Sequence, residues 1–322
     1  MKNILISSAG KRVVLVQIFQ RTLREMGIDA KVYATDKNSY LSPACHVADE
    51  CFNVPCCGDE YYMDELLRLC REKNIGVIIP TIDTELTVLA INRERLEEIG
   101  TQVAEPDLSI IRICRDKRLM AKFLPKIGID VPKMLDKYNP VFPMFAKPYD
   151  GSLSVNTHII RNEKELTKSI MDDPKLIFME YVDQDEYQEY TVDMYYGKDC
   201  RVKGIVPRER LKVRAGEISK GIARKNYLVD FLKERMDYIE GVRGCICIQL
   251  FYRESDHDIK GIEINPRFGG GFPLSYYAKA NYAEYIIREY LAGESIEYSD
   301  AWLDKTMMLR YDEDIIVYNA EI

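Results

Sequence analysis

Apolar residues in the first hundred positions of this 322-residue chain alternate between short continuous runs and longer helical patterns. In residues 13–23 the valine, isoleucine, phenylalanine and leucine side chains recur at helical spacing, and Gly27 is the expected helix stop. Residues 60–73 and a segment that ends near residue 98 also predict helices. Apolar runs typical of strands occupy residues 2–7, 31–36, 76–80 and 101–104. Strands that alternate with helices predict a parallel, doubly wound sheet.

Beyond residue 110 the pattern favours paired strands over the regular alternation of strand and helix. Residues 189–195 alternate strictly between polar and apolar, and residues 200–206 are expected to pair with them. Residues 207–221 are rich in Arg, Lys and Gly and lack apolar periodicity, so we expect a basic loop there. Further strands are predicted at 142–148, 155–160, 175–182, 244–251, 260–265, 306–309 and 315–318, and helices at 107–126, 163–171, 227–240 and 281–291. The fold class is therefore α/β followed by α+β.

The stretch 260–271 carries the strongest chemical signal in the chain. Its first half predicts a strand whose alternation places Glu263 and Asn265 on one face. A carboxylate and an amide oxygen at that spacing suit Mg²⁺, which takes hard oxygen ligands. Arg267 follows with a planar fork suited to phosphate or carboxylate, and three glycines then allow the backbone to approach a ligand closely.

Two other positions suggest contact with an anion or a metal. Lys147 ends the strand at 142–148, and the Gly/Ser-bearing turn after it could lay backbone N–H groups over phosphates, although an ordinary surface hairpin has the same pattern. Gln249 is the lone polar side chain of an apolar run, so it must be hydrogen-bonded or ligating. The basic segment 207–221 indicates either an anionic ligand or a solvated charged loop.

Polar residues also follow the predicted strands of the N-terminal sheet. Ligands bind beyond the carboxyl ends of such strands, so these residues are candidate substrate contacts, with turn and helix-cap roles as the alternative. They are Ser8, Arg12, Thr81, Asp83 and Glu85. The loop after the first strand has one glycine where a dinucleotide-binding fingerprint needs three, which argues against a dehydrogenase.

Composition excludes several classes of protein. A net charge of −7 argues against nucleic acid as the main partner. No apolar run approaches the length of a membrane span, and the N-terminus lacks the apolar region of a signal peptide. Nine cysteines without a CxxC pair predict thiols in a reducing cytoplasm rather than a disulfide framework or a zinc site.

Several motifs occur in one order along the chain. They are Lys147-Pro148, the Gly/Ser hairpin, 179–182 (Met-Glu-Tyr-Val), 189–193 (Glu-Tyr-Thr-Val-Asp), Gln249 and 263–267 (Glu-Ile-Asn-Pro-Arg). Together they resemble the ATP-grasp superfamily, in particular the carboxylate–amine ligases that are similar to the carbamoyl phosphate synthetase large subunit. The resemblance implies a Rossmann-like domain at 1–110, a small ATP-grasp subdomain with the phosphate hairpin at 111–185, and a metal-binding subdomain at 186–322.

The resemblance implies a nucleotide site. Lysines and hairpin serines would contact the phosphates of ATP, the segment 180–182 would hold the adenine, and Glu189 would bind the ribose. The residues concerned are Lys117, Lys147, Ser152, Ser154, Glu180, Tyr181, Val182 and Glu189.

The resemblance also implies a metal and a catalytic set. Gln249, Glu263 and Asn265 would coordinate Mg²⁺ or Mn²⁺. Arg267 would stabilise the transferred phosphoryl group with Lys147, and Arg214 of the basic segment would face the acyl phosphate or the substrate. The implied reaction joins a carboxylate to an amine through an acyl phosphate and releases ADP. The partners would be these two small molecules, with a homodimer as one form of assembly.

The sequence departs from the family pattern in two respects. Leu153 and Asn156 stand where glycines are common in the hairpin, and one metal position is Gln249 rather than an acid. Two other functions stay open at this stage. One is a kinase that phosphorylates a small molecule and stops, and the other is a nucleotide-binding protein without turnover.

Overall fold

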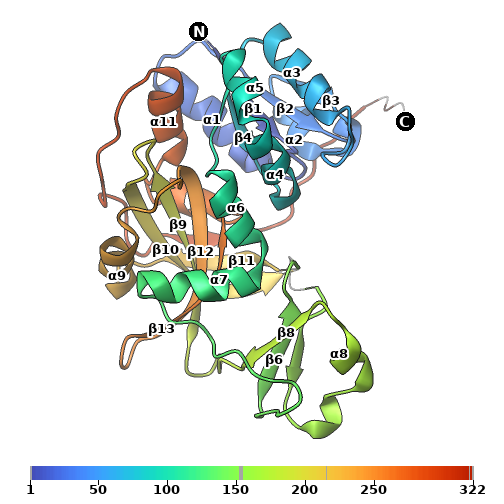
Figure 1. Ribbon diagram of the computed structural model, residues 1–322. Coiled ribbons are helices and arrows are strands. Elements are labelled where there is room, and N and C mark those ends of the chain that lie inside the picture. Colours follow the sequence, from blue (N-terminus) through green and yellow to red (C-terminus); the bar gives the residue numbers. More distant parts are fainter. Residues whose placement is uncertain (1, 152–154, 215, 319, 321–322) are drawn as a thin grey trace.

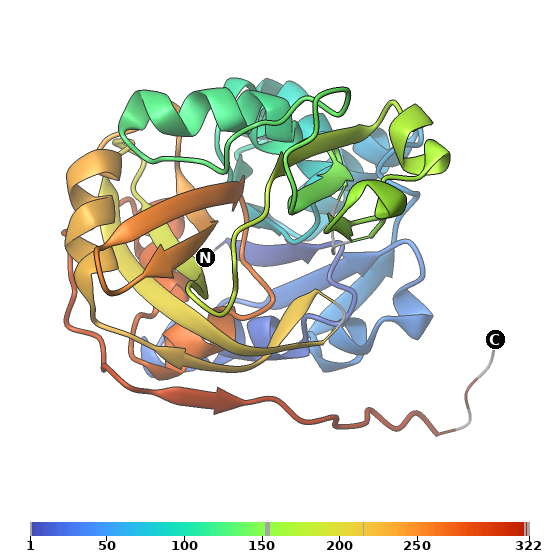
Figure 2. The same ribbon diagram turned by 90° about the horizontal axis from the view of Figure 1, so that it is seen from below.

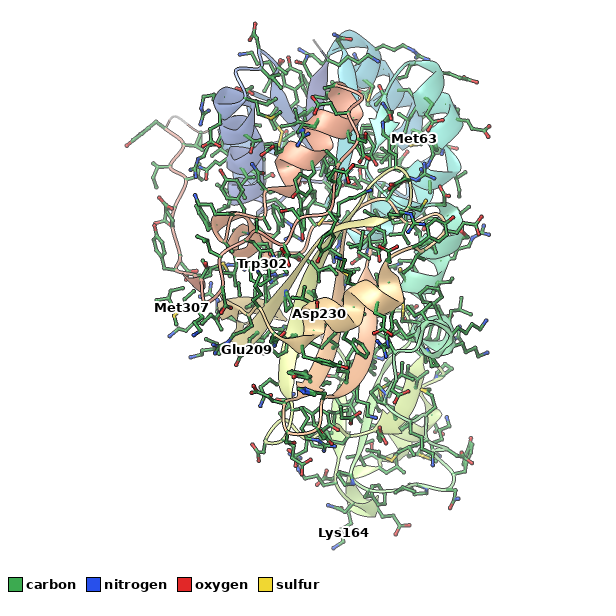
Figure 3. All side chains as sticks on the ribbon, turned by 90° about the vertical axis from the view of Figure 1, so that its left-hand side faces the viewer. Met63, Lys164, Glu209, Asp230, Trp302 and Met307 are labelled. Atoms are coloured by element: carbon green, nitrogen blue, oxygen red, sulfur yellow. A yellow bond between two sulfur atoms is a disulfide. The ribbon has the colours of Figure 1, made fainter. Side chains whose placement is uncertain are left out.

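The computed structural model describes residues 2–151, 155–214, 216–318 and 320. Three units follow one another along its long axis (Figure 1): an N-terminal α/β unit, a six-stranded sheet and a small three-stranded unit. Met63 of the first unit and Lys164 of the third mark opposite ends of the molecule (Figure 3). The six-stranded sheet therefore lies between the other two units.

The N-terminal unit is built on the parallel sheet that the sequence predicts. Its strand order is β3-β2-β1-β4-β5. The strands are β1 (Asn3–Ser7), β2 (Val32–Asp36), β3 (Glu50–Asn53), β4 (Ile75–Pro80) and β5 (Gln102–Val103). The helices are α1 (Val13–Glu25), α2 (Pro43–Val47), α3 (Tyr62–Glu72), α4 (Asp83–Ile91) and α5 (Arg93–Glu98), with a 3₁₀ turn at Ser39–Leu41. The predictions missed α2 and β3, which lie in a short stretch without clear periodicity.

Successive side chains of β1 pack on opposite faces of the sheet. Ile4 and Ile6 face α1 and α2, whereas Leu5 faces the apolar sides of α3, α4 and α5. Both faces of the sheet are thus covered, as a parallel sheet requires.

The three-stranded unit is joined to the first by a helical segment. That segment contains α6 (Leu108–Arg115), α7 (Lys117–Phe123) and a 3₁₀ turn at Leu124–Ile127. The unit itself contains β6 (Met144–Pro148), β7 (His158–Ile160), β8 (Leu176–Glu180), α8 (Lys168–Asp172) and a 3₁₀ turn at Glu163–Glu165. The strands are antiparallel in the order β7-β6-β8, and they enclose a small separate core that includes Met144, Ile160 and Phe178.

The six-stranded antiparallel sheet has the order β13-β12-β9-β10-β11-β14. Its strands are β9 (Gln188–Tyr196), β10 (Val202–Arg214), β11 (Glu217–Ala223), β12 (Gly244–Arg253), β13 (Asp258–Asn265) and β14 (Met307–Leu309). Its helices are α9 (Tyr227–Met236), α10 (Phe272–Tyr277) and α11 (Tyr282–Ile286), the last continuing as a π-helical turn at Ile287–Leu291. Helix α9, marked by Asp230, lies across this sheet (Figure 3), and β14 runs along its edge (Figure 2).

One large hydrophobic core extends through two of the three units. It includes Ile6 and Phe19 of the N-terminal unit together with Val192 and Ile248 of the six-stranded sheet. Helix α11 packs on α1, and Asn281 Nδ2 donates to Thr22 Oγ1 at 3.2 Å. The N-terminal unit and the six-stranded sheet are therefore a single packed body, whereas the three-stranded unit keeps its own core.

One loop prediction and one strand prediction are wrong. Residues 207–221 are not a loop, because β10 continues to Arg214 and β11 begins at Glu217. The alternation is inverted there: Arg208 is buried, while Leu211 and Val213 are exposed. Residues 315–318 lie in the described part of the chain and do not form the predicted strand.

The cysteine prediction is wrong at one pair. Cys45 and Cys51 form a disulfide between α2 and β3, and the other seven cysteines are free thiols. Among the helices of the described ranges, none combines the length and the apolar character that a membrane crossing needs.

Candidate active site

The register of the six-stranded sheet places the predicted metal ligands beside one another. Strand β12 pairs with β13 so that Gln249 lies opposite Glu263 and Cys247 opposite Asn265. Asn265 Nδ2 donates to Glu263 Oε1 at 3.2 Å. Carboxylate and amide oxygens are therefore gathered on one face of two neighbouring strands.

Two lysines from other elements reach this group. Lys117 is the first residue of α7, and its Nζ lies 3.3 Å from Glu263 Oε2 and donates to Gly151 O at 2.5 Å. Its backbone N donates to Tyr149 O at 2.8 Å, which ties α7 to the segment after β6. Lys147 lies in β6 and is buried. The site is thus assembled where the three-stranded unit, α7 and the six-stranded sheet meet.

Burial and charge set the protonation of these groups. Burial lowers the pKa of Lys147 to about 8, with Glu263 opposing and Lys117 reinforcing the shift. Burial acts to raise the pKa of Glu263, but the nearby positive charges of Lys117 and Lys147 outweigh it, and the pKa is lowered overall. The carboxylate therefore stays ionised between two lysines.

Glu189 belongs to the same sheet and holds Gln249 in place. Gln249 Nε2 donates to Glu189 Oε1 at 2.6 Å, and Arg210 Nη1 lies 2.9 Å from the same oxygen. Since Nε2 is the donor, the amide oxygen of Gln249 is the atom left to act as a ligand. The predicted ribose contact and the predicted metal ligand are direct neighbours.

Arg267 joins the six-stranded sheet to the N-terminal unit. Its Nε and Nη2 donate to the two carboxylate oxygens of Asp83 at 2.9 and 2.8 Å. Asp83 is in the first turn of α4, so this bidentate pair fixes the guanidinium from across the interface. The candidate substrate contact Asp83 thus meets the candidate catalytic arginine.

The three glycines after Arg267 pack against protein side chains. A Cβ on Gly271 would lie 2.1 Å from Arg208 Nη1, and one on Gly269 would lie 3.2 Å from Cys247 Sγ. Beneath them Arg208 and Asp193 form a buried bidentate pair at 2.7 Å. The glycines let the loop cover this ion pair, which is a different reason from the predicted approach to a ligand.

Several predicted site residues are not brought to the Lys117–Glu263 group. Arg214 is largely exposed and pairs with Asp312. The segment 180–182 begins with Glu180, the last residue of β8, and continues into the chain that leads to the six-stranded sheet; Glu180 N donates to Lys133 O at 2.8 Å. Ser152 and Ser154 lie outside the described residues.

Two N-terminal candidates have structural roles. Thr81 Oγ1 donates to Ser8 O at 2.6 Å, which joins the loops after β4 and β1. Glu85 is fully buried and accepts a hydrogen bond from Tyr62 OH. Burial raises the pKa of Glu85, so this side chain favours its neutral form.

Arg210 was missed by the sequence predictions. Had 207–214 been identified as a strand, alternation would have placed Arg208 and Arg210 on one face, toward Asp193 and Glu189 of the neighbouring strand. The signal was present, but the four basic residues at alternate positions suggested a solvated segment.

The donor set fits a hard cation and phosphates. The described residues contain no group of three His, Cys, Asp or Glu side chains that could hold a metal. Glu263, Asn265 and Gln249 nevertheless offer one carboxylate and two amide oxygens, which is the type of ligand that Mg²⁺ accepts beside the phosphates of a substrate. Two lysines facing one carboxylate leave positive charge for those phosphates.

Comparisons with protein families match two parts of the chain. Residues 4–104 match the family described as PylC-like, N-terminal domain. Residues 172–311 match the family described as ATP-grasp in the biosynthetic pathway with Ter operon. No curated protein matches the sequence.

Solved structures share the fold at low sequence identity. The biotin carboxylase domain of Hydrogenobacter thermophilus 2-oxoglutarate carboxylase, with MgADP, ADP and bicarbonate, has a TM-score of 0.72 at 16% identity, over 95% of this chain and 73% of that one. Staphylococcus aureus N5-carboxyaminoimidazole synthetase, complexed with ADP, has a TM-score of 0.71 at 18% identity, over 92% and 80%. Campylobacter jejuni biotin carboxylase has a TM-score of 0.69 at 14% identity, over 95% and 74%.

A parallel five-stranded sheet, a three-stranded sheet and an antiparallel six-stranded sheet are present in one chain. The fold brings Lys117, Lys147 and Glu263, which are far apart in the sequence, close together in space. The chain therefore carries a match to a PylC-like N-terminal domain at residues 4–104 and a match to an ATP-grasp domain at residues 172–311, and it shares its fold with a biotin carboxylase domain and with N5-carboxyaminoimidazole synthetase.

Proposed function

We propose that this protein is an ATP- and Mg²⁺-dependent ligase that joins a carboxylate to an amine through an acyl phosphate. The observation that carries the proposal is the meeting of Lys117, Lys147 and Glu263 from three different elements. A carboxylate is a poor electrophile until it is phosphorylated, and phosphoryl transfer needs positioning and charge neutralisation more than a protein nucleophile. The structural relatives named above, a biotin carboxylase and N5-carboxyaminoimidazole synthetase, support this class of reaction.

In this proposal the lysines bind the phosphates of ATP. Lys117 now rests against Glu263 and the carbonyl of Gly151, so nucleotide binding would exchange these contacts for phosphate oxygens. Lys147 is buried and therefore positions its ammonium group without bulk water around it. Glu180, Tyr181 and Val182 would hold the adenine, and Glu189 would bind the ribose.

Glu263, Asn265 and Gln249 would hold Mg²⁺ or Mn²⁺, which would neutralise charge on the terminal phosphates. Arg267, which Asp83 orients, would stabilise the transferred phosphoryl group. We leave Arg214 out of the catalytic set because its side chain pairs with Asp312 and is mostly exposed. The amine then attacks the acyl carbon, and inorganic phosphate leaves.

Hydroxylamine tests this chemistry. With ATP, Mg²⁺ and a panel of carboxylates, we expect a hydroxamate together with ADP, because hydroxylamine replaces the amine and captures the acyl phosphate. AMP with pyrophosphate would instead mean adenylation and would reject the proposal. ADP with a stable phosphorylated product and no hydroxamate would indicate the kinase, and ATP binding without turnover would indicate a sensor.

The assembly and location belong to the same proposal. We place the reaction in the cytoplasm, where both small-molecule substrates and MgATP are available. A homodimer is the expected assembly, since the Hydrogenobacter relative is described as a dimer of its biotin carboxylase domain. Sedimentation of the purified protein would decide this point.

A further inference from the structure

A second basic cluster lies at the interface between the N-terminal unit and the six-stranded sheet, beside Arg267. Its other cationic members are Arg12 and Lys11 from the loop after β1 and Arg310 from the segment after β14. Gly270 marks its centre. A Cβ on Gly270 would lie 2.8 Å from Arg12 Nη1, and Arg310 Nη2 donates to the carbonyl of Gly270.

Carboxylates of the cluster are already engaged by other cations. Glu217 Oε2 lies 3.0 Å from Arg310 Nη1, and Glu217 Oε1 lies 3.4 Å from Lys11 Nζ. Asp83 is held by both donor groups of Arg267. The nearby Asp36 accepts backbone N–H groups of its own loops, from Gly10 and Asn38.

Arg12 is the member without a direct ion pair, although the charge of Glu217 acts on it from beyond 4.0 Å. Over the described ranges its guanidinium makes no hydrogen bond and no ion pair within 4.0 Å. Burial, followed by the positive charge of Arg267, lowers the pKa of Arg12, so the surroundings resist its charge. Four cations share two carboxylates, so the cluster has an excess of positive charge, and Arg12 is the cation that no carboxylate contacts directly.

The cluster is held rigidly in place. Phe268, next to Arg267, packs edge-on against Phe19 of α1 with ring centroids 6.0 Å apart, and it is buried. The loop that carries Gly270 is therefore fixed to the helix that begins after Arg12. A guanidinium that is already positioned and makes no direct ion pair is suited to bind an anionic group of a ligand.

We propose that Arg12, supported by Arg310 and Arg267, binds a second acidic group on the carboxylate substrate, so that the preferred substrate is a dianion. This inference rests on the proposed ligase function and adds the substrate class. One acidic group would be phosphorylated near Arg267, while the other, a carboxylate or a phosphate, would be held by Arg12. A simple monocarboxylate leaves Arg12 unmatched.

Matched probes test the preference. Hydroxamate and ADP formation would be measured with succinate against succinamate, L-glutamate against L-glutamine, and 3-phosphoglycerate against glycerate. In each pair one acidic group is replaced by a neutral one. We expect the wild type to prefer one class of dianion by about 10- to 100-fold in kcat/KM, the range that one charge-assisted hydrogen bond supplies. The phosphate and carboxylate pairs distinguish the two kinds of second group.

The Arg12→Gln variant should lose this preference while it keeps hydroxamate formation from the neutral partner of the pair. Arg24→Gln is the matched control, because Arg24 is an exposed arginine at the opposite end of the same helix. Unchanged selectivity in Arg12→Gln, with hydroxamate still formed, would overturn the dianion site and leave the ligase function standing. Equal use of both members of every pair by the wild type would overturn it as well.

A binding measurement decides the matter if no carboxylate in the panel is turned over. Thermal shifts would be recorded with malonate and, at equal ionic strength, with acetate. We expect malonate to stabilise the wild type and Arg24→Gln, with at least about tenfold weaker apparent binding to Arg12→Gln. Equal stabilisation of all three proteins by malonate would reject the site. Absence of any hydroxamate, by contrast, bears on the proposed ligase function.

Discussion

Raising the pH should weaken ATP binding through Lys147. This ammonium group is buried in β6 beside Glu263 and Lys117, and its pKa is lowered to about 8. The proposed role needs the charged form. Above about pH 8 the unliganded protein holds Lys147 mostly neutral, so part of the binding free energy must go into protonating it.

The magnitude follows from this pKa. If ATP binds only the charged form, the apparent Kd should rise about tenfold between pH 7 and pH 9, since the charged fraction falls from about nine-tenths to about one-tenth. The effect of pH on folding stability has the opposite direction: a higher pH should stabilise the fold while it weakens ATP binding. A lysine whose pKa falls from 10.5 to about 8 on folding binds fewer protons in the native state. The free energy of unfolding should therefore rise with pH between about pH 8 and pH 10.5, by roughly 3 kcal/mol in total.

Calorimetric titration with ATP provides the assay. Mg²⁺ is kept present so that the nucleotide stays fully ionised, and two buffers of different ionisation enthalpy are used. Proton uptake should be close to zero at pH 6.5 and about half a proton per ATP at pH 8. The Lys147→Met variant should bind ATP weakly and without this pH dependence. Lys164→Met, an exposed lysine of the same three-stranded unit, should behave as the wild type.

A flat Kd from pH 7 to pH 9 in the wild type would refute the reasoning, because a buried ammonium in contact with phosphate must show this linkage. Equal pH dependence in the wild type and Lys147→Met would assign the titration to another group. Weakened adenosine binding in Lys147→Met would show that the residue supports the fold of the site rather than the phosphates.

Glu263→Gln should keep the circular dichroism spectrum of the wild type but abolish ADP release, since it removes the only carboxylate among the three proposed ligands; turnover at the wild-type rate would contradict the metal assignment. Asp83→Asn should lower the free energy of unfolding in urea by about 2 kcal/mol, because it leaves a half-buried arginine without its counterion. Asp64→Asn, which breaks an exposed pair at 2.7 Å, should cost under about 1 kcal/mol, and equal losses would rule out the burial argument. Gly271→Ala should lower stability by about 1–3 kcal/mol because its Cβ would meet a buried guanidinium at 2.1 Å. Gly58→Ala, with open space around it, should stay within about 0.5 kcal/mol, and a similar result for both glycines would contradict the packing assigned to the loop.

The common face of the proposed ligands Glu263 and Asn265 could be predicted because it depends on local geometry. Alternation along a strand places Glu263 and Asn265 on one face in any sheet, so the sequence alone was sufficient. The pairing of Glu263 with Lys117 is different in kind. It depends on how α7 docks on β13, and no periodicity in either segment contains that information.

The basic segment 207–221 shows what the sequence alone could not predict. Burial of an arginine in a strand is costly unless a carboxylate pairs with it. The partner of Arg208 is Asp193 on the neighbouring strand. A run of Arg and Lys therefore has the appearance of a solvated loop until the pairing of β9 with β10 is known. The same dependence on neighbours explains the glycines after Arg267, whose packing surface is this ion pair.

The shared core of the N-terminal unit and the six-stranded sheet limits how such proteins can be recombined. Phe19 of the first unit packs against Phe268 of the second, so a chimera that exchanged residues 1–110 alone would bring mismatched halves of one interior together. In the described part of the three-stranded unit, Met144, Ile160 and Phe178 belong to a separate core. Exchange of that unit between relatives should therefore give folded hybrids, and it offers a practical route to transplanting nucleotide-binding properties.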